Sequence, residues 1–104
     1  MQPLDLLILN SACDDWENLT SIRASVESDL NDNPVDEATL EACLLHLVWE
    51  GLVDAHEFSG GAFVRMAPDA VKEEFIHRFW YFVTPAGRQL LDANEAFFDK
   101  PGDS

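Results

Sequence analysis

Chemistry in this chain would have to come from its few histidines and cysteines or from paired carboxylates. Cys43 and His46 are three residues apart, a spacing at which two side chains on a helix can ligate one metal ion. In the helix expected there, Cys43 falls on the apolar face and His46 on its flank, and the nearby sequence offers no third ligand. We therefore predict a buried cysteine and a surface histidine, with no metal site and no cofactor.

The other candidate groups do not form a catalytic pattern. His56 and Glu57 are neighbours in a stretch that alternates like a strand, so their side chains should point to opposite faces. His77 begins an aromatic segment without an evident partner, and neither cysteine is accompanied by a base that could activate it. Gly60-Gly61 lacks the spacing of a phosphate-binding loop. The sequence predicts a protein that is not an enzyme.

Composition places narrow bounds on the rest. The 104 residues include 6 Lys and Arg against 20 Asp and Glu, a formal charge of −14, and 47% are hydrophobic. These values predict one globular domain and argue against binding to nucleic acid or to an anionic membrane. Two cysteines imply no disulfide framework, and the apolar run 6–9 is too short for a signal peptide or a membrane span. We expect a cytoplasmic protein, and a halophilic source would be another explanation of the acidity.

Hydrophobic periodicity predicts three helices in the first half of the chain. The first spans residues 3–13. The second follows Asp15, a suitable N-cap, and runs to about residue 30, where the Asn-Asp-Asn-Pro sequence breaks the pattern. The third follows the N-cap Asp36 and ends at Gly51, a residue type that favours the left-handed position after a helix.

The second half should contain the strands. We expect two strands joined by a Ser-Gly-Gly turn, then a short helix, an aromatic strand and a last helix. Thr84 and Pro85 suit the N-cap and first turn of that last helix. Residues 1–100 would form one domain and residues 101–104 a frayed tail. The expected ranges of the elements are 52–58, 62–66, 68–75, 78–83 and 84–100.

Two stretches in this order resemble the winged helix-turn-helix regulators of the PadR and MarR types. The first stretch begins with Val35 to Leu40 and ends with Glu50-Gly51-Leu52-Val53. The second stretch is Tyr81 to Leu91. The resemblance implies an α+β fold with three helices, a small antiparallel sheet and a C-terminal helix. It also implies that the third helix is the DNA-recognition helix. The expected wing, Ser59 to His77, is longer than a simple hairpin.

The charge of the expected helix-turn-helix does not suit DNA. No Lys or Arg lies between Arg23 and Arg65, whereas phosphate contacts need basic residues around the recognition helix. The family's DNA contacts therefore cannot be transferred to this chain. That interval holds nine acidic residues: Glu27, Asp29, Asp32, Asp36, Glu37, Glu41, Glu50, Asp54 and Glu57.

The third helix carries a second apolar stripe opposite its core face. Ala38, Ala42, Leu45 and Trp49 recur at i, i+4, i+7 and i+11, on the side that would face DNA. Small residues with one Leu and one Trp suit a protein contact better than base edges. One interpretation is an interface with a protein partner or a second copy. The other is that the long wing or a terminal helix covers the stripe.

The region after residue 74 differs in charge from the rest. From Phe75 to Leu91 there is no acidic residue, while Arg78 and Arg88 are present. Both arginines could form ion pairs within the acidic domain, or they could hold an acidic ligand.

Aromatic residues in the same region suggest a second contact surface. Trp80, Phe97 and Phe98 would give a dimer seam, since winged-helix regulators often dimerise through terminal helices. The alternative is that Phe97 and Phe98 complete the core.

The function predicted from the sequence is a non-enzymatic protein-interaction module resembling a transcriptional regulator. It would contact a protein partner or itself through the stripe on the third helix. A DNA-binding regulator of winged-helix type and an acidic DNA mimic that binds a basic protein are the alternatives.

Overall fold

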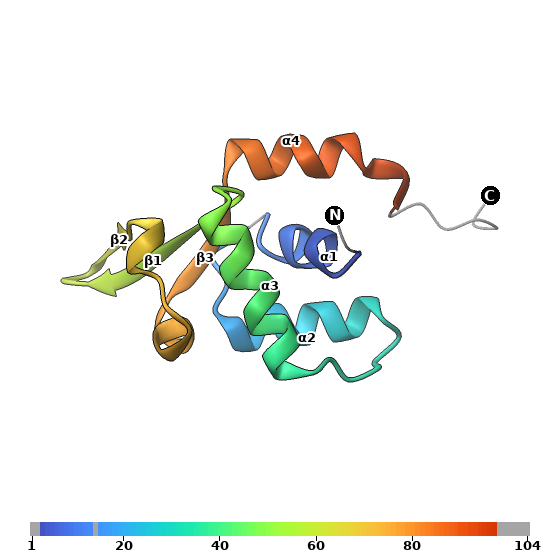
Figure 1. Ribbon diagram of the computed structural model, residues 1–104, viewed down its shortest axis with the longest axis horizontal. Coiled ribbons are helices and arrows are strands. Elements are labelled where there is room, and N and C mark those ends of the chain that lie inside the picture. The colour runs from blue at the N-terminus through green and yellow to red at the C-terminus, as the bar shows by residue number, and fades with distance from the viewer. Residues whose placement is uncertain (1–2, 14, 98–104) are drawn as a thin grey trace.

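The computed structural model describes residues 3–13 and 15–97, with only the backbone of Phe97 included. These residues form an α+β fold in which helices pack on a small antiparallel sheet (Figure 1). The coarse class therefore agrees with the sequence prediction. The elements are α1 (Pro3–Ser11), α2 (Leu19–Asp29), α3 (Glu37–Trp49), β1 (Val53–Ser59), β2 (Ala62–Arg65), η1 (Pro68–Ala70), η2 (Glu73–Arg78), β3 (Trp80–Val83), α4 (Pro85–Ala93) and η3 (Glu95–Phe97).

Helix α3 begins and ends where the sequence indicates. The Asp36 carboxylate accepts a hydrogen bond from the Thr39 amide at 3.0 Å, which satisfies one free N–H of the first turn. Gly51 follows the helix with φ of 78°, a conformation that glycine adopts without strain. Thr84 likewise caps α4, its hydroxyl accepting from the Gly87 amide at 3.1 Å.

Helix α2 begins later than predicted. Its N-cap is Asn18, which accepts from the Ser21 amide at 2.8 Å, and not Asp15. The cause lies in the preceding segment, where Glu17 and Tyr81 exchange backbone hydrogen bonds of 3.0 and 2.7 Å. This pairing holds the chain extended along β3, so the helix can begin only after it.

Other boundaries also shift. Helix α1 ends at Ser11, two residues early, and β3 begins at Trp80 because Arg78 belongs to η2. Helix α4 ends at Ala93, well before residue 100, because the Asn94 amide group donates to the Leu90 carbonyl at 2.8 Å and caps the last turn. The predicted tail 101–104 lies outside the described residues.

The sheet has the strand order β2–β1–β3, and both pairings are antiparallel. Val53 and Ala55 of β1 and Tyr81 and Val83 of β3 face the helices and are buried. Ala12 and Glu17 pair with the outer edge of β3: the Val83 amide donates to the Ala12 carbonyl at 3.0 Å, and Glu17 pairs with Tyr81. Among the described residues no strand covers the outer edge of β2.

The core lies between the sheet and the first three helices. Helix α1 lies between α2 and α4, and it also contacts α3 (Figure 1). Its central position explains why the whole run Leu6 to Leu9 is buried, although one face would suffice for a surface helix. The fully buried side chains of the other two helices include Ile22, Val26, Leu40 and Leu44.

The segment after β2 folds back over α3 as two short 3-10 turns in place of the single helix expected at 68–75. Val71 and Lys72 between the turns are extended, which interrupts a continuous helix and lets Val71 point inward. Val71 and Ile76 are fully buried. The Trp49 indole donates to the Val71 carbonyl at 3.1 Å, and the Tyr81 hydroxyl donates to the Ile76 carbonyl at 2.7 Å.

Replacing Tyr81 with Phe tests the attachment of η2. Burial raises the pKa of the Tyr81 phenol above its usual range, so the hydroxyl stays protonated and can donate. Removing it leaves the Ile76 carbonyl without this donor, and we expect a loss of about 1–2 kcal/mol in the free energy of unfolding by urea. The exposed Ser28→Ala change should alter it by less than about 0.5 kcal/mol. An unchanged free energy of unfolding in Tyr81→Phe would contradict the role of this bond.

Replacing Gly87 with Ala tests the packing of α4. A Cβ atom there would lie 2.2 Å from the Leu52 carbonyl oxygen and 2.5 Å from Val83 Cγ2. The contact with backbone cannot be relieved by a side-chain rotation, so we expect a loss of about 2–3 kcal/mol in thermal or urea unfolding. The exposed Gln89→Ala in the same helix should be nearly neutral. Equal stability of the two variants would show that α4 sits farther from the sheet.

Candidate interaction surface

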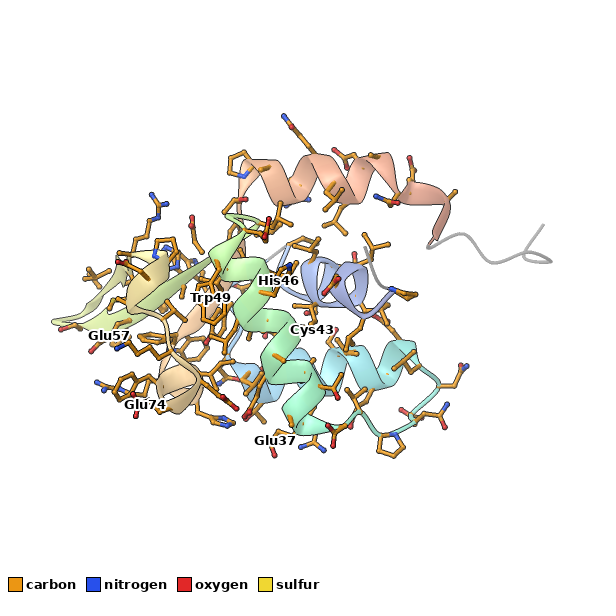
Figure 2. All side chains as sticks on the ribbon, in the orientation of Figure 1. Glu37, Cys43, His46, Trp49, Glu57 and Glu74 are labelled. Atoms are coloured by element: carbon orange, nitrogen blue, oxygen red, sulfur yellow. The ribbon has the colours of Figure 1, made fainter. Side chains whose placement is uncertain are left out.

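The stripe predicted on α3 is not one continuous surface. Ala38 and Ala42 are exposed, but Leu45 is only 5% exposed and belongs to the core. Trp49 is 56% exposed, yet its indole is already bonded to the Val71 carbonyl (Figure 2). The segment η1–η2 packs on α3, as the sequence interpretation of a covering wing had allowed. Of the predicted stripe, only Ala38, Ala42 and the exposed part of Trp49 remain accessible.

The β1–β2 hairpin carries more exposed apolar surface. Of the five large hydrophobic side chains exposed among the described residues, three belong to it, and the others are Trp49 and Phe75. Phe58 and Phe63 are cross-strand partners on one face, and Val64 points to the opposite face. The exposed fractions of Phe58, Phe63 and Val64 are 57%, 38% and 51%. Sequence reasoning missed this surface because it treated the hairpin only as a connection.

An aromatic cluster supports the hairpin from the outer face of the sheet. The Trp16 ring stacks on Phe63 with centroids 4.3 Å apart and planes 12° apart. Trp80 meets Phe63 edge-on at 6.0 Å, and Phe58 meets it at 5.2 Å. Such contacts between rings fix their relative positions beyond what area burial alone provides. Phe58 and Phe63 are therefore presented by an ordered platform, which favours binding because little side-chain entropy is lost.

His56 is part of the same cluster. Its ring meets Trp16 edge-on with centroids 4.2 Å apart, and its Nδ1 is buried without a hydrogen-bond partner among the described atoms. Burial lowers the pKa of His56, and the charge of Asp54 opposes that effect in part. His56 thus serves as a neutral aromatic member of the sheet face, while Glu57 points the other way toward Arg78.

Of the predicted dimer seam, the structure describes Trp80 and the backbone of Phe97, and it places these two apart (Figure 1). Trp80 lies on the outer face of the sheet, whereas η3, which contains Phe97, follows α4 at the opposite end of the molecule (Figure 1). The side chain of Phe97 and all of Phe98 lie outside the described part of the chain. Trp80 is half-buried against Phe63 and thus belongs to the hairpin platform.

The arginines are held by contacts within the domain. Arg78 lies 3.5 Å from a Glu57 carboxylate oxygen and over the Phe75 ring, 5.5 Å from its centroid. Arg65 lies 3.3 Å from an Asp54 oxygen. These exposed pairs contribute little to stability but occupy the guanidinium groups. The sequence allowed two possibilities for Arg78, an ion pair within the domain or an acidic ligand, and the structure contains the ion pair.

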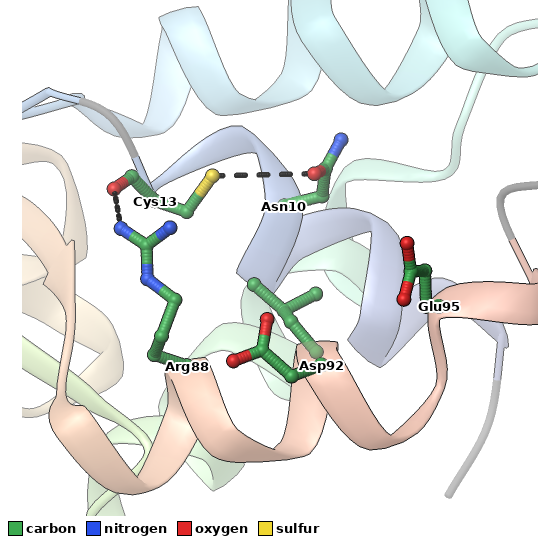
Figure 3. Close-up of a pocket in the computed structure, with 6 residues that line it drawn as sticks. Asn10, Cys13, Arg88, Asp92 and Glu95 are labelled. Atoms are coloured by element: carbon green, nitrogen blue, oxygen red, sulfur yellow. Dashed lines mark hydrogen bonds between the residues drawn. The ribbon is translucent and has the colours of Figure 1, made fainter.

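Arg88 borders a shallow hollow of about 280 Å³ between α1 and α4 (Figure 3). Its guanidinium donates to the Cys13 carbonyl, and the Cys13 thiol faces the Asn10 side chain at 4.0 Å. Asp92 and Glu95 also line the hollow, so an acidic ligand would meet two carboxylates beside one occupied arginine. This setting does not favour the acidic-ligand role considered for Arg88.

Cys43 and His46 do not converge. Cys43 is half-buried near Asp5, and burial together with that carboxylate raises the pKa of its thiol. His46 is exposed on α3 (Figure 2), and it lies 3.7 Å from Glu50, the C-cap residue of that helix. His77, in contrast, has partners that the sequence did not reveal: its Nε2 lies 3.1 Å from Glu41 Oε1 and 3.4 Å from Glu37 Oε1. These residues are 36 and 40 positions away, so only the Glu37/Glu41 spacing of one helical turn hinted at the cluster.

A pH titration of stability tests the environment of His56. Because its pKa is lowered in the folded state, the unfolded chain binds more protons below the ordinary pKa of histidine. The free energy of unfolding is therefore highest above that pKa and decreases as the pH falls below it, with a slope of at most about 1.4 kcal/mol per pH unit. Between pH 7 and 5.5 the stability of His56→Phe should therefore fall less than that of the wild type in urea unfolding. Identical pH slopes would contradict the buried, neutral ring.

Among residues 3–13 and 15–97, no helix has the length and apolarity needed to cross a membrane. A comparison of the chain with protein-family models, curated proteins and solved structures finds no match.

Proposed function

We propose that the chain is a non-enzymatic protein-interaction module that binds a second copy of itself through the β1–β2 hairpin. The observation that carries the proposal is the concentration of exposed Phe58, Phe63 and Val64 on this hairpin. Exposed apolar groups that cluster on an ordered platform are typical of protein contacts. The hairpin takes the place of the α3 stripe as the contact surface because Leu45 of that stripe is buried.

The distribution of charge favours a second copy of the chain as the partner that binds the hairpin. Each chain carries a formal −14, so two copies repel each other over most of their surface. Residues 58–68 contain no acidic residue and only one charge, that of Arg65. Two copies that meet at their hairpin tips would keep their acidic helices apart. A strongly basic partner would instead be drawn to the acidic helices.

The open edge of β2 supplies a mode of contact. An uncovered edge strand presents backbone N–H and C=O groups that can pair with another strand. Two β2 edges related by a two-fold axis would pair antiparallel, since a symmetric interface brings the same patch together from both subunits. The strand is only four residues long, so the apolar side chains on its two faces must supply much of the affinity.

The element order supports a relation to winged helix-turn-helix regulators. The order of three helices, a hairpin, a third strand and a closing helix is compatible with the resemblance, under which α3 would be the recognition helix and residues 59–77 the wing. The contacts of this chain weigh against DNA binding, because η1–η2 packs on α3 and Arg65 is paired with Asp54. DNA binding and DNA mimicry therefore enter as outcomes of the test.

Sedimentation equilibrium over a range of concentrations tests the proposal. We expect a monomer–dimer equilibrium that strengthens as salt is raised, because salt screens the repulsion between two acidic chains. The double variant Phe58→Ser/Val64→Lys should weaken it by about tenfold or more, since it removes apolar area and places two like charges near the two-fold axis. Circular dichroism would confirm that the variant keeps its fold.

Trp49→Asp is the matched control, since it alters a similarly exposed aromatic side chain outside the hairpin. It should dimerise like the wild type. A monomer at every concentration, or a dimer lost in Trp49→Asp and kept in the hairpin variant, would overturn the proposal. So would sequence-selective DNA binding that Arg65→Ala abolishes, or salt-sensitive binding to a cationic nucleic-acid-binding protein with no self-association.

A further inference from the structure

Two elements far apart in sequence place three ligand-type side chains together. Glu37 and Glu41 project from the first turns of α3, and His77 comes from the last turn of η2. The imidazole Nε2 lies 3.1 Å from Glu41 Oε1 and 3.4 Å from Glu37 Oε1, and the three atoms all lie within 4.8 Å of one another. The cluster combines two carboxylate ligands from α3 with one nitrogen ligand from η2, the element that packs on this helix.

The surrounding structure holds each group in place. Only 15% of the Glu41 side chain is exposed, so its carboxylate has little freedom to turn away. Ile76, next to His77, is fully buried, and its carbonyl accepts the hydrogen bond from Tyr81, which fixes the end of η2. Arg23 lies 3.8 Å from Glu37 Oε2 and leaves Oε1 turned to the histidine. Such preorganisation is what a metal site needs before the ion arrives.

We propose that Glu37, Glu41 and His77 bind a divalent transition-metal ion, with Zn²⁺ the best match. Zinc takes nitrogen and carboxylate ligands at about 2.0–2.2 Å, which in a tetrahedron sets ligand atoms about 3.4 Å apart. The distances from the histidine nitrogen to both carboxylates are already close to that value. Imidazole makes the set unsuited to Mg²⁺ and Ca²⁺, which prefer oxygen ligands throughout. Water would complete the coordination.

The local charge also favours a cation. Three carboxylates, those of Glu37, Glu41 and the nearby Glu27, stand against the single guanidinium of Arg23. Glu41 also lines an open hollow with Lys72, Glu73 and Glu74, where carboxylates again outnumber the cation. A divalent ion would relieve the repulsion between two carboxylates one turn apart on the same helix. It would also cross-link η2 to α3, a role independent of the proposed contact at the hairpin.

Calorimetric titration of the chelator-treated protein with ZnCl₂ tests the site. We expect one ion per chain, an upward shift in the melting temperature, and a shift of the His77 imidazole NMR signals without shifts at His46 or His56. His77→Ala should abolish these effects. Glu37→Gln, a change at an exposed position, should weaken binding by about tenfold or more.

His46→Ala is the matched control, because His46 also faces a glutamate, the C-cap residue Glu50 at 3.7 Å, but has no ligand from a second element. It should bind zinc like the wild type. Absence of zinc binding would overturn the proposal, as would binding that survives in both His77→Ala and Glu37→Gln. Loss of binding in His46→Ala would overturn it too, since the ion would then use the Cys43/His46 pair.

Discussion

The fold depends on the buried side chain of Tyr81. Its backbone pairs with Ala55 on one side and with Glu17 on the other, so one residue joins β1, β3 and the segment that leads into α2. Its hydroxyl reaches across the core to the Ile76 carbonyl and holds η2. A buried carbonyl without a donor would be costly, and this bond removes that cost where the chain crosses over α3. The path of residues 67–78 follows from this attachment.

That path decides which surfaces remain for binding. With Val71 and Ile76 buried and Trp49 bonded to the Val71 carbonyl, α3 loses much of the face that a recognition helix would present. The same crossing brings His77 to Glu37 and Glu41, which creates the candidate metal site. The hairpin is left projecting at the end of the molecule, supported by Trp16 and Trp80 but uncovered at its tip (Figure 1). One internal connection thus accounts for both the partial cover of α3 and the candidate metal site.

Much of this fold could be predicted from sequence because local signals dominate it. Asp36, Gly51 and Thr84 act through hydrogen bonds and backbone preferences within a few residues, and these positions are as predicted. The errors arise where a distant partner decides. Asp15 is a reasonable cap, but strand pairing at Glu17 moves the start of the helix to Asn18. Leu45 and Trp49 share a helical stripe, yet helical spacing alone does not show that one is buried and the other is exposed. The His77 cluster escaped notice for the same reason.

Hydrogen exchange at low and high protein concentration measures the central claim, association through the hairpin edge, most directly. If two β2 strands pair, the amides of Ala62–Arg65 that point away from β1 should become protected as concentration rises. The amides of α3 should keep the same exchange rates, because the proposed contact does not involve that helix. Protection that appears on α3 and not on β2, or no concentration dependence at all, would contradict the account.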